Sequence, residues 1–587
     1  MEIPVQCERT KNIHVDDKFI SSIREACNWK KAERLPENSY YKLYVGDEIL
    51  NEMTSSDHQL IWGRRGTGKT HLLKAFTQKI NNDSDLCSMA FYISCDNVNV
   101  VSPVDIKFSN DDEKIKCLAR ETYISFLLSL TEQIIDEYNK ILENKSFFSS
   151  MNRKERQQLI RSVDNCLIEL YENCTQGIPK IVDKRITEIV SEVSEQTKEK
   201  CFESAAEGKL SFSHRINLAL HGQYNKKKRN SNNKTEESRT EKSYSFSFSK
   251  TKGTIKKLMS SLSIKTLYIC IDELWLIDQK RDLCLQPIFL DYIRQTLINS
   301  PNISIKIASI REVTKLNSKA SARNNFGLQS GHDIFEIANL DTLYTDRKDI
   351  VIKFKAILSQ RINYFSNMRY EEEYIINTVF KNERDFISLV CLAHYIPRNF
   401  IMILQRSLNA INYDLQHKTI HSYLIQNIVV NNYLEDKRSN LPMNTDSLYN
   451  LINNYIDTTK KFFFLISTVQ IKRLKAEIDN LVYIELLHQI PSSLLPREIM
   501  NDFKGFYIDS GKYLHALNYD VNNSQEELYN FSYILPETLK NNYREYIINL
   551  DNIESNFIEC VNCGNRISKN HPVYKSFRAC PVCAFKY

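Results

Sequence analysis

The stretch Gly63-Arg64-Arg65-Gly66-Thr67-Gly68-Lys69-Thr70 decides the fold, because it matches the phosphate-binding pattern G-x-x-x-x-G-K-[ST]. The chain has 13 glycines in 587 residues, and three of them lie in this octet. Glycines let the backbone wrap closely, so that successive N–H groups point at phosphate oxygens, and the start of a helix adds a favourable dipole. An apolar strand at 58–62 and a helical pattern from about Lys69 to Ile80 flank the loop as this geometry requires. A glycine turn without a ligand is the alternative, and the flanking pattern disfavours it.

The octet predicts a site for ATP and magnesium. Lys69 would reach the β- and γ-phosphates, and the hydroxyl of Thr70 would ligate Mg²⁺. The second half of the site is Leu267–Glu273, an apolar strand that ends in two carboxylates. Asp272 would hold Mg²⁺ through water, and Glu273 would orient and deprotonate the attacking water. The alternative is that both carboxylates only cap the next helix. Because Glu273 can act as a base, the sequence favours a hydrolase over a passive nucleotide sensor.

Apolar stretches that alternate with helical patterns predict a parallel α/β sheet. The expected strands are 58–62, Met89–Ser94, Leu267–Ile271, Ile303–Ser309 and Asp333–Ile337. About 170 residues separate the second strand from the third, far more than a crossover needs. Helical spacing of apolar residues around 126–141 and 182–193 predicts two long amphipathic helices in this interval. A core over 57–345, with a helical insertion at about 105–208, is therefore expected.

The insertion ends in two alternating stretches, Leu210–Ser213 and Tyr244–Ser249, which predict a hairpin within residues 209–250. Their polar connection, 222–242, contains the basic run Lys226-Lys227-Lys228-Arg229. A solvated loop is the simpler interpretation of this run, and a loop that contacts phosphates is the other.

Three further polar residues are candidates for reading the nucleotide. Ser309 ends the fourth strand, where a polar side chain could bridge the catalytic water or the γ-phosphate, and Arg311 could contact the γ-phosphate directly. Both could also be ordinary polar groups at a strand end. Arg398 follows Pro397 at the expected start of a helix. It could point into a cleft or into solvent.

Beyond the core, the pattern predicts a helical lid over 346–418 and a mixed domain over 419–550, while 1–56 form an N-terminal segment. Near the end of the mixed domain, Phe506–Ile508 and Lys512–His515 are expected to pair through an Asp509-Ser510-Gly511 turn. Helices followed by a small hairpin indicate a winged helix.

Residues 551–587 carry a zinc-ribbon signature, Cys560-x₂-Cys563 and Cys580-x₂-Cys583 separated by 16 residues. Four thiolates give the closed tetrahedral shell of a structural zinc, which leaves no open position for catalysis. A redox pair or unligated thiols are the alternatives. So small a module cannot fold on its own apolar core, and the metal would supply the missing stability. The module could bind DNA, RNA or a protein, and its lysines and an arginine favour nucleic acid.

Composition sets broader bounds. A length of 587 residues implies several domains, and the net charge of +6 permits a nucleic-acid-binding face without arguing for one. The N-terminus lacks a signal-peptide pattern, and no apolar run approaches the roughly 20 residues that span a bilayer. The 15 cysteines are expected to be reduced thiols apart from the metal site. A cytoplasmic protein that does not enter membranes is therefore expected.

Taken together, Gly63–Thr70, Asp272-Glu273, Ser309 and Pro397-Arg398 resemble the AAA+ ATPases, and within them the origin-recognition and initiator-like branch. The resemblance covers roughly 57–104 and 255–415, plus the expected winged helix. It implies that Arg398 is the sensor 2 arginine and Ser309 the sensor 1 residue. It also implies an arginine finger acting in trans, for which Arg323 is the match, and hence a homo-oligomer.

Two departures from that branch keep a second function open. The helical insertion is not part of the common core, and Arg311 is similar to the strand-end arginine of the signal-transduction (STAND) NTPases. The first hypothesis is an AAA+-like ATPase that uses ATP to switch or assemble on double-stranded DNA. The second is a STAND-like signalling ATPase of bacterial anti-phage defence, in which a partner protein supplies the effector activity.

Overall fold

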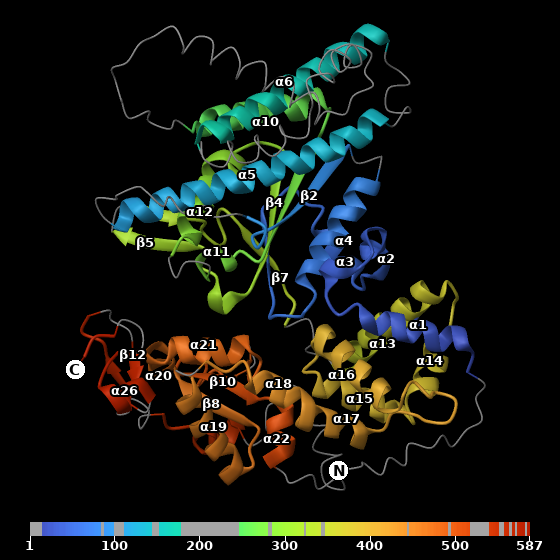
Figure 1. The fold of residues 1–587 in the computed structure, drawn as a ribbon, viewed down its shortest axis with the longest axis vertical. Coiled ribbons are helices and arrows are strands. Elements are labelled where there is room, and N and C mark those ends of the chain that lie inside the picture. Colours follow the sequence, from blue (N-terminus) through green and yellow to red (C-terminus); the bar gives the residue numbers. More distant parts are fainter. Residues whose placement is uncertain are drawn as a thin grey trace. The chain divides into compact units, whose positions relative to one another are not determined.

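The structure, a computed structural model, describes residues 15–83, 87–98, 111–143, 152–177, 246–279, 284–321, 324–341, 347–442, 445–490, 495–516, 539–550, 557–562, 566–569, 572–580 and 584–586. Contacts between residues divide the chain into two compact units (Figure 1). The sheet unit comprises Gly46–Gly63 and Lys69–Asn339. The helical unit comprises Met1–Val45, Arg64–Gly68 and Leu340–Tyr587, so the middle of the phosphate loop belongs to it.

The sheet unit is built on a five-stranded parallel sheet in the order β2-β3-β4-β1-β7. Its strands are β1 (Gln59–Trp62), β2 (Ser88–Ser94), β3 (Thr266–Asp272), β4 (Ile303–Ser309) and β7 (Phe335–Asn339). All five strands expected from the sequence are confirmed, as is the α/β class. Because β4 lies between β1 and β3, Ser309 pairs with Trp62 while the neighbouring Ala308 pairs with Asp272.

Helices and a small hairpin complete the sheet unit. They are α3 (Asp47–Glu52), α4 (Lys69–Asn82), α5 (Asp111–Glu143), α6 (Arg153–Gly177), α10 (Phe248–Ser261), α11 (Leu276–Gln279), α12 (Gln286–Ile293), η4 (Arg294–Ile298), η5 (Arg311–Val313) and the antiparallel pair β5 (Asn317–Ser321) and β6 (Asn324–Gly327). The insertion contributes α5 and α6, which pack against each other, and α5 also packs on β2 and α12. The second helix expected in the insertion, at 182–193, lies outside the described residues.

The hairpin expected within 209–250 is wrong for its second stretch, because Phe248 and Ser249 begin α10. Ser247 caps this helix by accepting a hydrogen bond from the Lys250 N–H, which replaces strand pairing with helix initiation. Phe248 then packs on Tyr123 of α5. The alternation of serine and aromatic residues therefore reflects a helix cap and its contacts. The first stretch lies outside the described residues.

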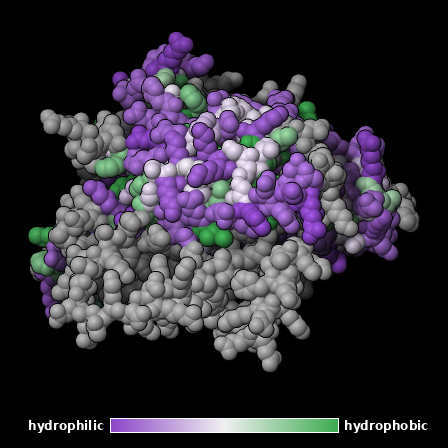
Figure 2. Space-filling view, turned by 90° about the horizontal axis from the view of Figure 1, so that it is seen from above, coloured by the Kyte–Doolittle hydropathy of each residue, from purple (hydrophilic) through white to green (hydrophobic). Residues whose placement is uncertain are grey.

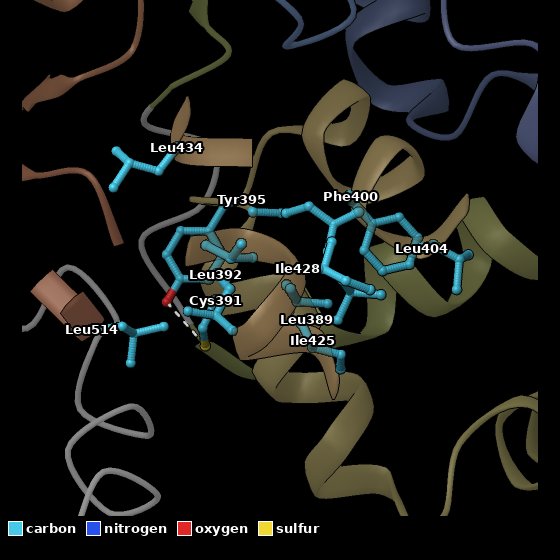
Figure 3. Packing of buried hydrophobic residues seen from close by; sticks show 14 of the residues in the cluster. Leu389, Cys391, Leu392, Tyr395, Phe400, Leu404, Ile425, Ile428, Leu434 and Leu514 are labelled. Atoms are coloured by element: carbon cyan, nitrogen blue, oxygen red, sulfur yellow. Dashed lines mark hydrogen bonds between the residues drawn. The ribbon is translucent and has the colours of Figure 1, made fainter. Parts of the chain in front are cut away.

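The helical unit has a large hydrophobic core that joins the expected lid to the domain after it, and a smaller second core within that domain. Its first elements are α1 (Asp17–Asn28), η1 (Ala32–Arg34), η2 (Glu37–Ser39), α2 (Tyr40–Leu43), α13 (Arg347–Ser366), α14 (Glu372–Val379), α15 (Glu383–Leu392), α16 (Pro397–Ala410), α17 (Ser422–Ile428), η6 (Val429–Tyr433) and α18 (Leu434–Arg438). The N-terminal helix α1 packs on α13 and α16, so it is part of this unit. Figure 3 shows the packing where α15, α16 and α17 meet, with the Tyr395 hydroxyl 3.7 Å from the Cys391 sulfur.

The later part of the helical unit contains a three-stranded antiparallel sheet in the order β8-β10-β9. Its elements are α19 (Asp446–Thr459), β8 (Phe463–Ser467), α20 (Thr468–Arg473), α21 (Lys475–Tyr483), β9 (Leu487–Gln489), β10 (Phe503–Ile508), α22 (Ser510–Ala516), α24 (Leu539–Asn542) and η8 (Tyr543–Tyr546). The expected strand at 506–508 is confirmed within β10, but its partners are β8 and β9. The expected strand Lys512–His515 is wrong. These residues lie in α22, because Asp509 Oδ1 accepts from the Gly511 N–H and the chain turns into a helix.

The described part of the C-terminal segment holds a short hairpin, β11 (Phe557–Glu559) with β12 (Arg566–Ser568), and the helix α26 (Pro572–Phe577). None of the described helices is long and apolar enough to cross a membrane. On the face seen in Figure 2, the coloured surface is mostly hydrophilic and its apolar residues occur in small groups.

Candidate nucleotide site

The phosphate loop follows a fully buried strand and opens a helix, as the motif requires. All four residues of β1 are buried, and α4 begins at Lys69. Gly66 and Gly68 have φ of +86° and +100°, a region that favours glycine. The ammonium of Lys69 donates to the carbonyl oxygen of Gly63 across 2.6 Å. This contact folds the lysine back along the loop, and a phosphate oxygen would compete for the same ammonium.

Thr70 and Asp272 are in direct contact within the sheet unit. The Thr70 hydroxyl donates to Asp272 Oδ2 at 2.6 Å, and the Tyr92 hydroxyl donates to the same oxygen at 2.9 Å. Asp272 is completely buried, and this burial raises the pKa of its carboxyl group, although the bond from Thr70 and the charge of Lys69 act in the opposite direction. The Thr70 hydroxyl and the Asp272 carboxylate lie next to each other, and both supply the hard oxygen ligands that Mg²⁺ prefers. The two residues therefore fit a magnesium site.

Glu273 has an unusual backbone. Its φ is +54°, in the left-handed region that costs most residues about 1–2 kcal/mol. Its N–H donates to Asp272 Oδ1 at 2.9 Å, which helps to fix this conformation directly after the strand. Its side chain is partly exposed. A strained residue beside a buried carboxylate is typical of functional sites.

The two candidates after β4 differ in their surroundings. Ser309 is buried, and its hydroxyl lies 2.6 Å from that of Thr314, while its carbonyl accepts from the Gly63 N–H at 3.3 Å. The strand order therefore brings Ser309 beside the start of the phosphate loop. Arg311 is about half exposed and pairs with Glu336 at 2.5 Å. Its guanidinium lies 5.3 Å from the ring centroid of Trp62.

Arg398 lies against the phosphate loop within the helical unit. Its N–H donates to the Gly66 carbonyl at 3.3 Å. A Cβ atom on Gly66 would lie 2.9 Å from the Cβ of Arg398 and 2.9 Å from Cγ2 of Ile396. Only glycine fits this approach, since its φ is also positive. The sequence therefore identified an arginine that the fold places at the loop.

Four residues near the loop were not singled out from the sequence: Tyr92, Asp341, His394 and His488. The Asp341 carboxylate accepts from both the N–H and the Nε of Arg64, and Arg64 Nη1 lies 2.7 Å from Nδ1 of His488. Tyr92 alone had a sequence signal. It lies two positions before Ser94, the register partner of Asp272, and so on the same face of the sheet.

The family model described as ORC-CDC6-like matches residues 27–388. This range covers more than half of the chain and contains the loop, Asp272, Ser309 and the expected arginine finger. The chain belongs to the ORC-CDC6-like family. It is therefore an ATPase of the AAA+ type with an origin-recognition-like character, as the resemblance predicted. Arg323, the expected finger, lies outside the described residues.

Two solved structures are similar to this ORC-CDC6-like chain. A chain from the structure of Drosophila ORC bound to DNA is 9% identical, with a TM-score of 0.29, and the alignment covers 88% of this chain and 96% of that chain. A Walker-type ATPase of Pyrococcus abyssi is 13% identical, with a TM-score of 0.31 and coverage of 88% and 99%. Because both TM-scores are low, the assignment to the family rests on the family model alone. A comparison with curated proteins finds no match.

The zinc signature is only partly within the described residues. Cys560 and Cys580 are buried in one small cluster with Tyr574, and Ile558 packs against it. The Cys580 N–H donates to the Phe585 carbonyl, and the Ala584 N–H donates to the Cys580 carbonyl. Two buried sulfurs in one cluster fit soft-metal ligation. Cys563 and Cys583 lie outside the described residues, so the four-sulfur site stays a prediction.

Proposed function

We propose that the protein binds ATP with Mg²⁺ at residues Gly63–Thr70 and hydrolyses it to drive a conformational or assembly switch on DNA. One observation carries the nucleotide part of this proposal: the 2.6 Å contact between the Thr70 hydroxyl and Asp272 Oδ2. It joins the end of the loop to the end of β3 through two oxygen atoms, and the Tyr92 hydroxyl donates to the same carboxylate oxygen. Thr70 and Asp272 would hold Mg²⁺ there, and the metal would supply charge that offsets the charge of the phosphates.

Each residue of the site has a proposed task. Lys69 would leave the Gly63 carbonyl to pair with the phosphates, and the N–H groups of the loop would bind their oxygens. Asp272 would hold the hydrated metal, with Tyr92 keeping its carboxylate oriented. Glu273 would position the attacking water and accept its proton. Ser309 and Arg398, which lie beside Gly63 and Gly66, are the proposed sensors of the γ-phosphate.

Paired variants test the nucleotide chemistry. Lys69→Ala should lose ATP binding, whereas Glu273→Gln should bind ATP and fail to turn it over. Fluorescent-nucleotide titration and phosphate release separate the two results. Glu312→Gln, which removes a carboxylate from η5, is the control. If Glu273→Gln hydrolyses ATP at the wild-type rate, the assignment of the base is wrong.

The DNA part of the proposal is supported by the order of elements from α19 to β10. A winged helix requires the order helix, strand, two helices and two strands, and α19 to β10 follow this order. Helices α20 and α21 would form its helix-turn-helix pair. Such a pair presents its second helix to the major groove. Lys472, Arg473 and Lys475 are exposed at the junction of these helices. A cluster of three cations there would contact phosphates.

ATPase rate with and without duplex DNA tests this part. We expect stimulation by DNA in the wild type and its loss in a Lys472→Glu/Arg473→Glu double variant. Binding of that variant should also depend less steeply on salt, with a slope smaller by about 1 for each lost phosphate contact. Lys381→Glu/Arg384→Glu, on the surface before and within α15, is a control of equal charge. Equal DNA binding by both double variants would contradict a DNA face at α20 and α21.

A STAND-like signalling ATPase of anti-phage defence, acting through a partner protein, is the alternative. This alternative depends on Arg311 as the residue that contacts the γ-phosphate. The Arg311 guanidinium instead pairs with Glu336 and lies over the ring of Trp62. An ATPase that ignores DNA but assembles with ATP in sizing experiments would favour this alternative. Loss of that assembly in Arg311→Ala, but not in Arg398→Ala, would identify Arg311 as its sensor.

A further inference from the structure

A buried polar cluster of the helical unit contains one residue of the phosphate loop, Arg64. Its side chain is 7% exposed. Nε donates to Asp341 at 2.9 Å, and Nη1 lies 2.7 Å from His488 Nδ1. Because guanidinium can only donate, His488 must accept at Nδ1 and carry its proton on Nε2. The loop is thereby attached to β9, which contains His488.

The cluster continues from His488 to the start of α22. The rings of His488 and His394 are stacked with centroids 3.6 Å apart. His394 Nε2 accepts from the Ser510 N–H at 2.9 Å, so its proton is on Nδ1. Asp509 is fully buried, and Lys437 donates to its Oδ2 at 2.6 Å. Lys437 also donates to the Glu485 carbonyl, between α21 and β9.

Metal binding is the first function to consider here, since ligand atoms of His394, His488 and Asp509 lie within 4.8 Å of one another. The surroundings oppose it. The Lys437 ammonium occupies Asp509 Oδ2, and the guanidinium of Arg64 occupies His488 Nδ1. A divalent cation would add charge beside two buried cations. Hydrogen bonds and ring stacking instead link Arg64 of the loop to β9 and to the start of α22.

We propose that Arg64 is a positioning residue that couples the phosphate loop to the β8-β10-β9 sheet through His488. Asp341 fixes the backbone and side chain of Arg64, and His488 fixes the far end of its guanidinium. Nucleotide on the loop would therefore stabilise β9 and α22, and changes at His488 would alter nucleotide affinity. The proposal rests on nucleotide binding at Gly63–Thr70 and adds the route by which that binding reaches the C-terminal elements.

The coupling is testable by nucleotide titration and hydrogen exchange on the full chain. Arg64→Gln and His488→Phe should each weaken ADP binding about tenfold or more, the size expected for one charge-assisted hydrogen bond. The double variant should be no weaker than the worse single variant, because both remove the same contact. His488→Gln, which keeps an acceptor, should recover most of the affinity. His515→Phe, at an exposed histidine of α22, is the matched control.

The exchange experiment separates coupling from simple loss of structure. In the wild type, ADP should slow amide exchange at Leu487–Gln489 and Ser510–Ala516, and this protection should vanish in Arg64→Gln at saturating ADP. Additive losses in the double variant, or protection that survives in Arg64→Gln, would overturn the proposal. If the wild type binds no nucleotide and Lys69→Ala behaves identically, the proposed ATPase site itself fails, which is a different result.

Discussion

The hydroxyl of Thr70 and the carboxylate of Asp272 share a 2.6 Å hydrogen bond, although 202 positions separate them in the sequence. This bond joins the two side chains that would hold magnesium, Thr70 by its hydroxyl and Asp272 through water. Metal binding would therefore compete with an intramolecular hydrogen bond at a buried carboxylate. The energetic consequence can be measured by removing the charge.

Asp272→Asn should abolish the thermal stabilisation that ATP with Mg²⁺ gives the wild type, because the metal loses its buried carboxylate. Without ligand, the variant should be as stable as the wild type or more stable. Burial raises the pKa of this carboxyl group, which means that the folded state disfavours its charge. Differential scanning fluorimetry with and without ATP·Mg²⁺ measures both effects.

Asp278→Asn is the matched control, since burial also raises the pKa of Asp278. Its carboxylate accepts from the N–H groups of Leu285 and Gln286. This variant should keep the response to ATP·Mg²⁺. A full response in Asp272→Asn would show that the metal is held elsewhere.

Because the backbone of Glu273 is strained, two variants that both lose its carboxylate should differ in their free energy of unfolding. Glu273→Gly relieves the φ of +54°, whereas Glu273→Ala keeps it. We expect the glycine variant to be more stable by about 1 kcal/mol, and both to lack ATP turnover. Chemical unfolding and phosphate release provide the two measurements. A less stable glycine variant would mean that Glu273 does not hold this conformation in solution.

Much of this architecture could be predicted from local signals. Each strand of the parallel sheet is a short apolar run, and the loop motif has a fixed spacing. The five strands, and the closeness of Thr70 to Asp272, could therefore be predicted. The alternation of polar and apolar residues gave a wrong prediction of a strand where a side chain that caps a helix decided the structure. Ser247 and Asp509 each start a helix by accepting a backbone N–H, and the residues after them resembled strands. Residues that act through long-range contacts, such as His488 beside Arg64, carry no local pattern at all.

The approach of Gly66 to α16 predicts a large cost for any side chain there. Gly66→Ala combines a φ of +86° with 2.9 Å overlaps on Arg398 and Ile396. We expect a loss of about 2–3 kcal/mol in unfolding free energy. Gly68→Ala is the matched control, since its φ is also positive but no atom lies within 4 Å of the added Cβ. In the absence of nucleotide, it should lose only about 1 kcal/mol. Equal losses would show that the contact with α16 is not maintained in solution.

The stacked histidines predict that stability falls in mild acid. Burial holds the pKa of His394 and His488 well below 6.5, and the charges of Arg64 and Lys437 act in the same direction, with Asp509 opposing them at His394. Below about pH 6.5 the unfolded chain binds protons that the folded chain does not, so folding becomes less favourable. Between pH 7.5 and 5.5 each histidine should cost about 1.4 kcal/mol.

Unfolding measured at both pH values checks this sign and size. His488→Gln should remove about half of the pH-dependent loss, because glutamine does not titrate. His417→Gln is the control, since the His417 side chain is 80% exposed. An unchanged pH dependence in His488→Gln would mean that this histidine is not held neutral.

The C-terminal cysteines predict one structural zinc per chain. Cys560 and Cys580 are buried together in a module with a core of only a few side chains, so metal removal should unfold residues 551–587 while leaving nucleotide binding intact. A mercurial reagent with a zinc-sensitive dye should release one equivalent, and Cys560→Ser should release none. Cys27→Ser is the control, because burial raises the pKa of the Cys27 thiol to about 12 and keeps it protonated in the α1 core. Proteolysis confined to the C-terminal module in Cys560→Ser would confirm that the metal stabilises this module alone, whereas a wild type without zinc would contradict the ribbon.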